Sequence, residues 1–228
     1  MQKNILFDLY GTLINIHTSE EGIIFWDNVK DSLYPNSTLS SSEIKNKYLS
    51  LCKAYSKNYE EIDILDVFTD MNNGDVSKAL ADAVEFRRLS TCYISLYPGV
   101  KECLIELKKL GYKIYVLSNA QRIFTIPELI KLGIKDLFDG IAISSDYGFK
   151  KPNLEFYKMA MKNFNISSGI MVGNEYECDV LPALELGLGS VFIYSNLTPR
   201  YPDYKERANL IDFNKDKLIK IITDLSWK

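Results

Sequence analysis

Histidine and cysteine are scarce in this chain of 228 residues, which has one histidine, His17, and four cysteines. The cysteines, Cys52, Cys92, Cys103 and Cys178, show no CxxC spacing. Zinc sites made of cysteine and histidine use closely spaced pairs of this kind. The sequence therefore excludes a Cys/His zinc site, and it excludes a serine or cysteine hydrolase with a histidine base unless His17 is that base.

Long apolar runs and a surplus of basic side chains are also missing. No run approaches the roughly 18–20 residues of a membrane-spanning helix, and the apolar stretch at the N-terminus is too short for a signal peptide. Basic side chains number 27 against 30 acidic ones, so we expect neither nucleic acid nor a membrane as partner. A reducing, cytoplasmic setting is the expectation. Nothing in the sequence specifies an oligomeric state.

Alternating strand and helix patterns run through most of the chain. Residues 4–10 read as a short buried strand that carries Asp8 near its end. After Pro98-Gly99, apolar strand patterns alternate with single helices of about 10–13 residues. These strands are predicted at 112–119, 138–145, 169–175 and 190–196. The alternation predicts parallel βαβ units, and hence an α/β fold with a Rossmann-like, doubly wound parallel sheet.

The segment 18–93 has a different pattern. Its apolar residues recur at intervals of three and four, which is typical of helices. Pro35 and the Asn72–Gly74 turn interrupt this pattern. We therefore predict an all-helical domain at 18–93, inserted into an α/β core formed by 1–17 and 94–228.

Four predicted strand ends carry polar side chains. They are Asp8, Ser118 with Asn119, the loop up to Lys151, and the stretch 174–179. Each has an ordinary explanation by itself, such as a helix cap, a turn or a solvated lysine. Because the carboxyl ends of parallel strands meet at one edge of a sheet, together they predict a single site.

These residues resemble a known family at the level of motifs. The segments FDLYGTL, VLSNA, KKP and VGNEYECD resemble motifs one to four of the haloacid dehalogenase superfamily, in the same order and on the same strands. The segment LYPGVKECLIELKKLGYKIYVLSN is similar to the core entry of members with a helical cap after motif one. The resemblance implies a hydrolase that forms a covalent aspartyl intermediate with a small anionic substrate.

The resemblance also implies roles for individual residues. Asp8 would be the nucleophile, Lys151 would neutralise charge beside it, and Thr12 would donate to the same region. Ser118 and Asn119 would hold the transferring group. A Mg²⁺ site would be completed by motif four, with the ligands Asp8, Tyr10, Asn174, Glu175 and Asp179. The chemistry of the residues agrees, since a nearby lysine and a divalent cation both favour an ionised carboxylate nucleophile.

Two positions depart from the phosphatases of this superfamily. Tyr10 stands where they have a second aspartate that acts as general acid, and a phenol is a poor acid at neutral pH. The family's 2-haloacid dehalogenases have a tyrosine there. Asn174 replaces a charged metal ligand, although its spacing to Asp179 is that of the phosphatases and Glu175 or Glu177 could compensate. The dehalogenases also use an arginine early in the cap, and this chain has none before Arg87.

The prediction is therefore a Mg²⁺-dependent phosphatase of a small phosphorylated metabolite. The alternatives are a metal-free 2-haloacid dehalogenase and a non-catalytic member that only binds its ligand. His17, where the chain enters the cap, and Arg87, on the last cap helix, are further candidates for substrate contacts. For Arg87, a solvated helix surface is the competing interpretation.

Overall fold

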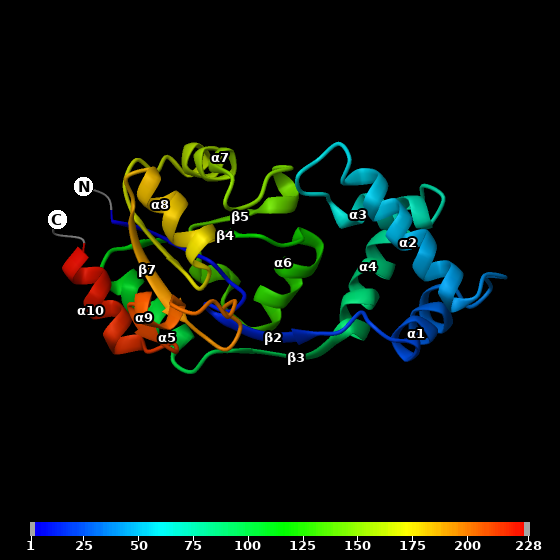
Figure 1. Cartoon of the computed structure of the whole chain (residues 1–228), viewed down its shortest axis with the longest axis horizontal. Helices are drawn as coiled ribbons and strands as arrows, with labels where there is room; N and C mark the ends of the chain where they lie inside the picture. Colours follow the sequence, from blue (N-terminus) through cyan, green and yellow to red (C-terminus); the bar gives the residue numbers. More distant parts are fainter. Residues whose placement is uncertain (1–2, 226–228) are drawn as a thin grey trace.

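A six-stranded parallel sheet forms the centre of the core in the computed structural model, which describes residues 3–225 (Figure 1). The strand order is β5-β4-β1-β6-β7-β8, and every neighbouring pair is parallel. The strands are β1 (Asn4–Phe7), β4 (Lys113–Ser118), β5 (Gly140–Ile143), β6 (Ile170–Gly173), β7 (Gly189–Tyr194) and β8 (Leu210–Ile211). All four residues of β1 and of β6 are buried, as expected for central strands covered on both faces. The predicted α/β fold is confirmed.

Helices cover both faces of this sheet. Leucines of α5 and α6 pack with α10 on one face, and α7 packs with α8 on the other. The core helices are α5 (Val100–Lys109), α6 (Arg122–Lys131), α7 (Leu154–Phe164), α8 (Leu181–Glu185), α9 (Tyr204–Arg207) and α10 (Lys215–Leu225). Short 3₁₀ turns lie at Lys135–Leu137 and Ser144–Asp146, and a π-helical turn at Tyr176–Val180 precedes α8. The helices close the core while leaving the carboxyl ends of the strands for the site.

Four helices form a separate cap with its own aromatic core (Figure 1). They are α1 (Ile23–Leu33), α2 (Ser41–Tyr55), α3 (Ile64–Met71) and α4 (Val76–Ser90). Buried side chains from all four meet at the centre: Phe25, Trp26, Tyr48, Phe68 and Phe86. Within the helical segment predicted at 18–93, α2 ends at Tyr55 and the Asp63 side chain caps the start of α3.

Two strands join the cap to the core. β2 (Ile14–Thr18) and β3 (Thr91–Leu96) pair antiparallel and run side by side between the two domains (Figure 1). The sequence analysis did not predict this ribbon, and its boundary at 18–93 falls near the outer ends of the two strands. Each strand pairs only with the other in the described sheets, so a pattern read locally does not reveal the pairing.

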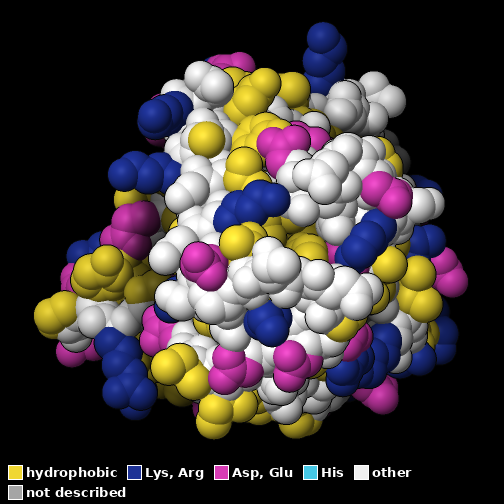
Figure 2. Space-filling model, turned by 90° about the vertical axis from the view of Figure 1, so that its right-hand side faces the viewer, with side chains coloured by type: hydrophobic (Ala, Val, Ile, Leu, Met, Phe, Trp, Pro, Cys, Tyr) yellow, Lys and Arg dark blue, Asp and Glu magenta, His cyan; other side chains and the backbone are white. Residues whose placement is uncertain are grey.

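The outer surface of the molecule at the cap end mixes side chains of every type. Figure 2 shows basic, acidic and hydrophobic side chains interspersed over this face. Within residues 3–225, no helix combines the length and the apolar character that crossing a membrane requires.

Candidate active site

The strand order brings the predicted residues together at one edge of the sheet. β1 lies between β4 and β6, so Asp8 after β1 is flanked by Ser118 at the end of β4 and Asn174 after β6. Lys151 reaches the same edge from the loop that follows β5. Residues that are far apart in the sequence thus form one cluster, as the motif positions predict.

The Asp8 carboxylate is held by donors on both oxygens. Lys151 Nζ lies 2.8 Å from Asp8 Oδ1, and Ser118 Oγ donates to the same oxygen at 3.4 Å. Thr12 Oγ1 donates to Oδ2 at 3.0 Å. Asp8 is only 7% exposed, so these donors replace the water that would otherwise stabilise its charge. The carboxylate is fixed in orientation with a cation on one oxygen, as a nucleophile requires.

Lys151 bridges two buried carboxylates. Its Nζ also lies 2.6 Å from Asp179 Oδ1. Burial alone would lower the pKa of Lys151, but the charges of Asp179 and Asp8 outweigh it and raise the pKa well above its usual value. The lysine therefore stays protonated and serves as a fixed positive charge. Asn119 holds its backbone, accepting from Lys151 N at 2.7 Å and donating to Lys151 O at 2.9 Å.

Asp179 completes this charge cluster from the π-helical turn. Its Oδ2 accepts a hydrogen bond from the Glu175 backbone N–H at 2.9 Å. Burial raises the pKa of Asp179 to about 6, although Lys151 opposes that shift. A Cβ at Gly173 would lie 2.1 Å from Asp179 Oδ2, so glycine is required for this close approach. Asp179 is therefore the buried ion-pair partner of Lys151, and its expected role as a metal ligand stays a prediction.

Asn174 lies against the other oxygen of Asp8. The amide atom that faces inward lies 3.2 Å from Asp8 Oδ2, the Tyr10 carbonyl oxygen and Thr12 Oγ1. With its nitrogen inward, the amide donates to all three atoms. Gly11 has a φ of +87°, and a Cβ there would lie 2.2 Å from the Asn174 side chain. The glycine therefore supplies both the turn and the room for the amide.

A Mg²⁺ ion fits this corner of the site only through a mixed set of oxygens. With its oxygen inward, Asn174 adds an amide oxygen to the Asp8 carboxylate and the Tyr10 carbonyl, and hard cations prefer such oxygen ligands. Among the described residues, no group of three or more His, Cys, Asp or Glu side chains is placed to hold a metal ion. The fit thus depends on Asn174 and on one carboxylate, and the expected ligand roles of Glu175 and Asp179 stay predictions.

The Tyr10 side chain leaves the site and enters the junction of core and cap. Its hydroxyl donates to Glu128 Oε2 at 2.5 Å and lies 3.0 Å from Thr125 Oγ1, both on α6. Burial and the neighbouring Glu128 carboxylate raise the pKa of Tyr10 well above its usual value. The phenol is therefore a weaker acid here than in water, and its proton is already engaged.

The two other predicted substrate contacts lie in different surroundings. His17 is exposed on β2 and stacks on Tyr93 of β3, with ring centres 6.0 Å apart. Arg87 is not the solvated residue of the competing interpretation: its side chain is 18% exposed, and Nε donates to Glu128 Oε1 at 2.7 Å. His17 thus belongs to the connecting ribbon, and Arg87 to the junction that also holds Tyr10.

Gln121, which none of the four motifs includes, fastens the cap loop to the core. Its Oε1 accepts from Ile64 N at 2.7 Å, and its Nε2 donates to Ile62 O at 2.8 Å and to Glu61 Oε1 at 3.2 Å. Ser144 Oγ also donates to Glu61, at 3.3 Å. In the sequence, only its place two residues after Asn119 of motif two points to a role for Gln121 near the site. These contacts hold the cap loop against the core.

Comparison with known proteins agrees with this geometry. Residues 2–187 match the haloacid dehalogenase-like hydrolase family. The chain is 30% identical over 209 residues to the glyceraldehyde 3-phosphate phosphatase of Methanocaldococcus jannaschii, covering 90% of each chain. It is 27% identical over 225 residues to the enzyme of the same name from Pyrococcus furiosus, covering 96% of this chain and 92% of the relative.

Solved structures share the fold over nearly the whole length. A HAD phosphatase from Thermococcus onnurineus has a TM-score of 0.63 and 23% identity, with 97% of this chain and 98% of the other covered. A 2-haloacid dehalogenase from Pseudomonas syringae has a TM-score of 0.64 and 17% identity, with 99% and 100% covered. Both subclasses share this architecture, so the fold alone does not choose between them. The chain belongs to the haloacid dehalogenase-like hydrolase family.

Proposed function

We propose that this protein is a phosphatase that removes phosphate from a small phosphorylated metabolite through a covalent intermediate on Asp8. Family membership and the phosphatase relatives that match most of the chain support this activity. The observation that carries the mechanism is the buried Asp8 carboxylate, with Lys151 on one oxygen and Thr12 on the other. A binding protein that releases its ligand unchanged has no need of a carboxylate held by donors on both oxygens.

The proposed reaction has two steps. An Asp8 oxygen attacks phosphorus, the bond from phosphorus to the leaving oxygen breaks, and an aspartyl phosphate remains. A water molecule then attacks that phosphorus, which regenerates the carboxylate and releases inorganic phosphate. Lys151 offsets the negative charge of the phosphoryl group, and the Ser118 hydroxyl can donate to it. Asp179 keeps the lysine in place throughout.

Mg²⁺ is the proposed cofactor, and Asp8, the Tyr10 carbonyl and the Asn174 amide oxygen would hold it. When bound, it supplies positive charge beside the transferring phosphoryl oxygens. The site needs this additional positive charge. Lys151 already pairs with the two carboxylates of Asp8 and Asp179, and a phosphate dianion would add further negative charge. Turning the Asn174 amide exchanges its donor for an acceptor, so one side chain suits the site both with and without the cation.

The position of Tyr10 restricts the leaving group. Because its hydroxyl donates to Glu128, Tyr10 does not supply a proton to the departing oxygen in this arrangement. We expect phosphate esters of acidic alcohols, such as p-nitrophenyl phosphate, to react faster than alkyl esters. The same observation favours the second candidate, 2-haloacid dehalogenase activity, because a halide leaves without a proton.

The test is a panel of substrates on the purified protein. It contains p-nitrophenyl phosphate, glyceraldehyde 3-phosphate, other sugar phosphates and nucleotides, and 2-chloropropionate, each with Mg²⁺ and with EDTA. Phosphate release that requires Mg²⁺ and is lost in Asp8→Asn, but not in the surface control Asp31→Asn, supports the proposal. Chloride release in EDTA supports the dehalogenase instead. A folded protein that binds phosphate esters without releasing phosphate contradicts both.

A further inference from the structure

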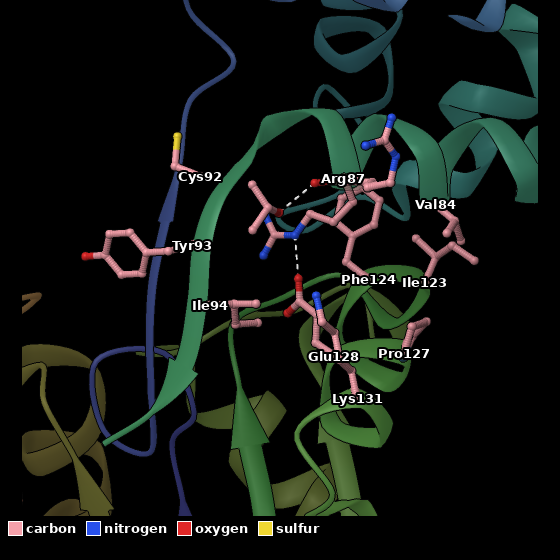
Figure 3. Close-up of a pocket in the computed structure, with 12 residues that line it drawn as sticks. Val84, Arg87, Cys92, Tyr93, Ile94, Ile123, Phe124, Pro127, Glu128 and Lys131 are labelled. Carbon is pink, nitrogen blue, oxygen red and sulfur yellow. Dashed lines mark hydrogen bonds and ion pairs between the residues drawn. The ribbon is translucent and has the colours of Figure 1, made fainter. Parts of the chain in front are cut away.

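A groove lies where the cap meets the core, apart from the catalytic centre. Helix α4 and strand β3 form one side of it, and α6 forms the other (Figure 3). Its volume is about 520 Å³, within the range of roughly 300–1,000 Å³ that holds small organic ligands. Asp8, Ser118, Lys151 and Asn174 are not among its lining residues. A molecule in the groove would therefore touch different side chains from a molecule at Asp8.

The walls of the groove are apolar over much of their area. Val84 and Ile94 line one side, and Ile123, Phe124 and Pro127 line the other (Figure 3). Val84 is 45% exposed, so the rim opens to solvent. Such walls favour a ligand with an aromatic or aliphatic part, which loses water-exposed area on binding.

Positive charge predominates among the lining residues. Arg87, Arg88 and Lys131 stand against one carboxylate, Glu128. Arg88 makes two hydrogen bonds of 2.6 Å to Glu85. Arg87 is paired with Glu128 through Nε alone, and Lys131 is the third cation of the lining. Glu128 is engaged as well, since it accepts from both Arg87 and Tyr10.

Arg87 is placed to anchor an anion. Its guanidinium is fixed by the bond from Nε to Glu128 and by the Phe124 ring, whose centre lies 5.2 Å from Arg87 Cζ. Among the hydrogen bonds within residues 3–225, the Arg87 guanidinium uses Nε alone, so its two terminal nitrogens keep their donors. A planar guanidinium with both terminal groups open binds carboxylate or phosphate through two parallel hydrogen bonds.

From this geometry we propose that the groove is a second ligand site, which binds a small organic anion, a carboxylate or phosphate attached to an apolar group. The anionic group lies on the terminal nitrogens of Arg87, and the apolar part lies against Ile94, Ile123 and Phe124. This site goes beyond the proposed phosphatase activity and does not depend on it.

The probe for the test is benzoate, a carboxylate on an aromatic ring, with neutral benzamide as its control. Binding is followed by NMR of isotope-labelled methyl groups, with Val84, Ile94 and Ile123 as reporters of the groove and Val172 as a reporter of the catalytic edge. We expect saturable shifts at the groove reporters with benzoate and much smaller ones with benzamide. Asp8→Asn leaves the benzoate affinity unchanged, because the carboxylate binds elsewhere.

Neighbouring arginines provide the matched variants. Arg87→Gln is expected to weaken benzoate binding about tenfold or more, as loss of charge-assisted hydrogen bonds implies, and Arg88→Gln less than about twofold. A second pair avoids the buried ion pair: Val84→Glu adds a repelling charge at the rim, whereas Leu80→Glu adds it one turn away, outside the groove. Val84→Glu should weaken binding and Leu80→Glu should leave it nearly unchanged.

Several results would overturn the site. One is benzoate binding that is insensitive to both Arg87→Gln and Val84→Glu, and another is equal binding of benzamide. Shifts confined to Val172 would place the anion at the catalytic centre instead. Absence of saturable shifts up to about 50 mM benzoate, well above a millimolar dissociation constant, would also exclude the groove as a ligand site. None of these readouts requires turnover, so failure of the phosphatase proposal is recognised separately.

Discussion

The catalytic edge and the seam between cap and core both consist of buried or half-buried polar side chains, but they join different things. At the edge, Lys151 holds Asp8 and Asp179, and all three belong to the core. At the seam, Gln121 of the core binds the backbone of the cap loop, and Glu128 of the core binds Arg87 of the cap. Opening of the cap would therefore break the seam contacts, which link two domains, and would leave the contacts of the edge intact.

This difference separates two roles. Charges that perform the chemistry are fixed by other charges of the same rigid unit, so they are already oriented when the substrate arrives. Contacts that control access are hydrogen bonds across two units, each of modest net stability. Mutations at the edge should act mainly on stability and on the chemical step, and mutations at the seam mainly on substrate entry.

The largest effect is expected when Lys151 is replaced. Lys151→Met leaves Asp8 and Asp179 buried without their shared cation, so the free energy of unfolding should fall by about 3–5 kcal/mol and turnover should be lost. Denaturation in urea measures the first effect. The neighbouring exposed lysine gives the control, because Lys150→Met should change stability by less than about 0.5 kcal/mol. Equal effects at the two positions would mean that the edge is not held by this charge.

Asn174→Asp tests the mixed oxygen set beside Asp8. In EDTA the new carboxylate faces Asp8 Oδ2, 3.2 Å from the present amide atom, and the repulsion should lower the melting temperature. In Mg²⁺ the same carboxylate becomes a charged ligand, so calorimetry should show roughly tenfold tighter binding and the stability should recover. Asn196→Asp, at an exposed position, is the control. A variant whose stability does not depend on Mg²⁺ contradicts the assignment of this corner as the cation site.

Gln121→Ala tests the seam. The substitution removes the bonds to Ile62, Ile64 and Glu61, so the closed cap should be less populated and KM should rise several-fold with a smaller change in kcat. Limited proteolysis of the loop 56–63 should become faster. Asn163→Ala, which removes an exposed amide on α7, is the control. A fall in kcat alone, with unchanged KM and proteolysis, would place Gln121 with the catalytic edge.

The smallest effect concerns pH. Burial raises the pKa of Glu61 above its ordinary value. The unfolded chain therefore releases this proton at lower pH than the folded chain does, so the contribution of Glu61 to stability falls as pH rises between the two pKa values. Glu61→Gln cannot titrate. We expect the stability of the variant relative to the original protein to increase with pH above about 4 and then to level off, as urea denaturation at a series of pH values would show. A difference that stays constant, or that changes in the opposite direction, rules out this account.

The edge could be predicted from the sequence for a physical reason. Parallel strands that are buried on both faces appear as continuous apolar runs, and their carboxyl ends meet wherever the strands pair. The sequence therefore predicts that Asp8, Ser118, Lys151 and Asn174 lie together. Their exact partners were not predictable: the ion pair of Asp179 with Lys151 follows from the burial of both side chains, and the metal-ligand role of Asp179 stays a prediction.

The seam and the ribbon lay beyond such arguments. Gln121 binds Ile64 only because of how the whole cap is oriented, and no local pattern contains that orientation. The same holds for Glu128, which lies within an amphipathic helix and meets Tyr10 and Arg87 from distant segments. The ribbon strand β3, with its alternating sequence TCYISL, carried a local signal for a strand, although not for its partner.

The pairing of β2 with β3 has a consequence for how the cap can move. A domain attached by two separate single chains can swivel and shear as well as tilt. Two chains that are hydrogen-bonded into one ribbon behave as a flat strip, which bends across its thin direction and resists rotation within its plane. The cap should therefore move as a hinge about one axis. The loop at Glu61 should then return to Gln121 each time the cap closes.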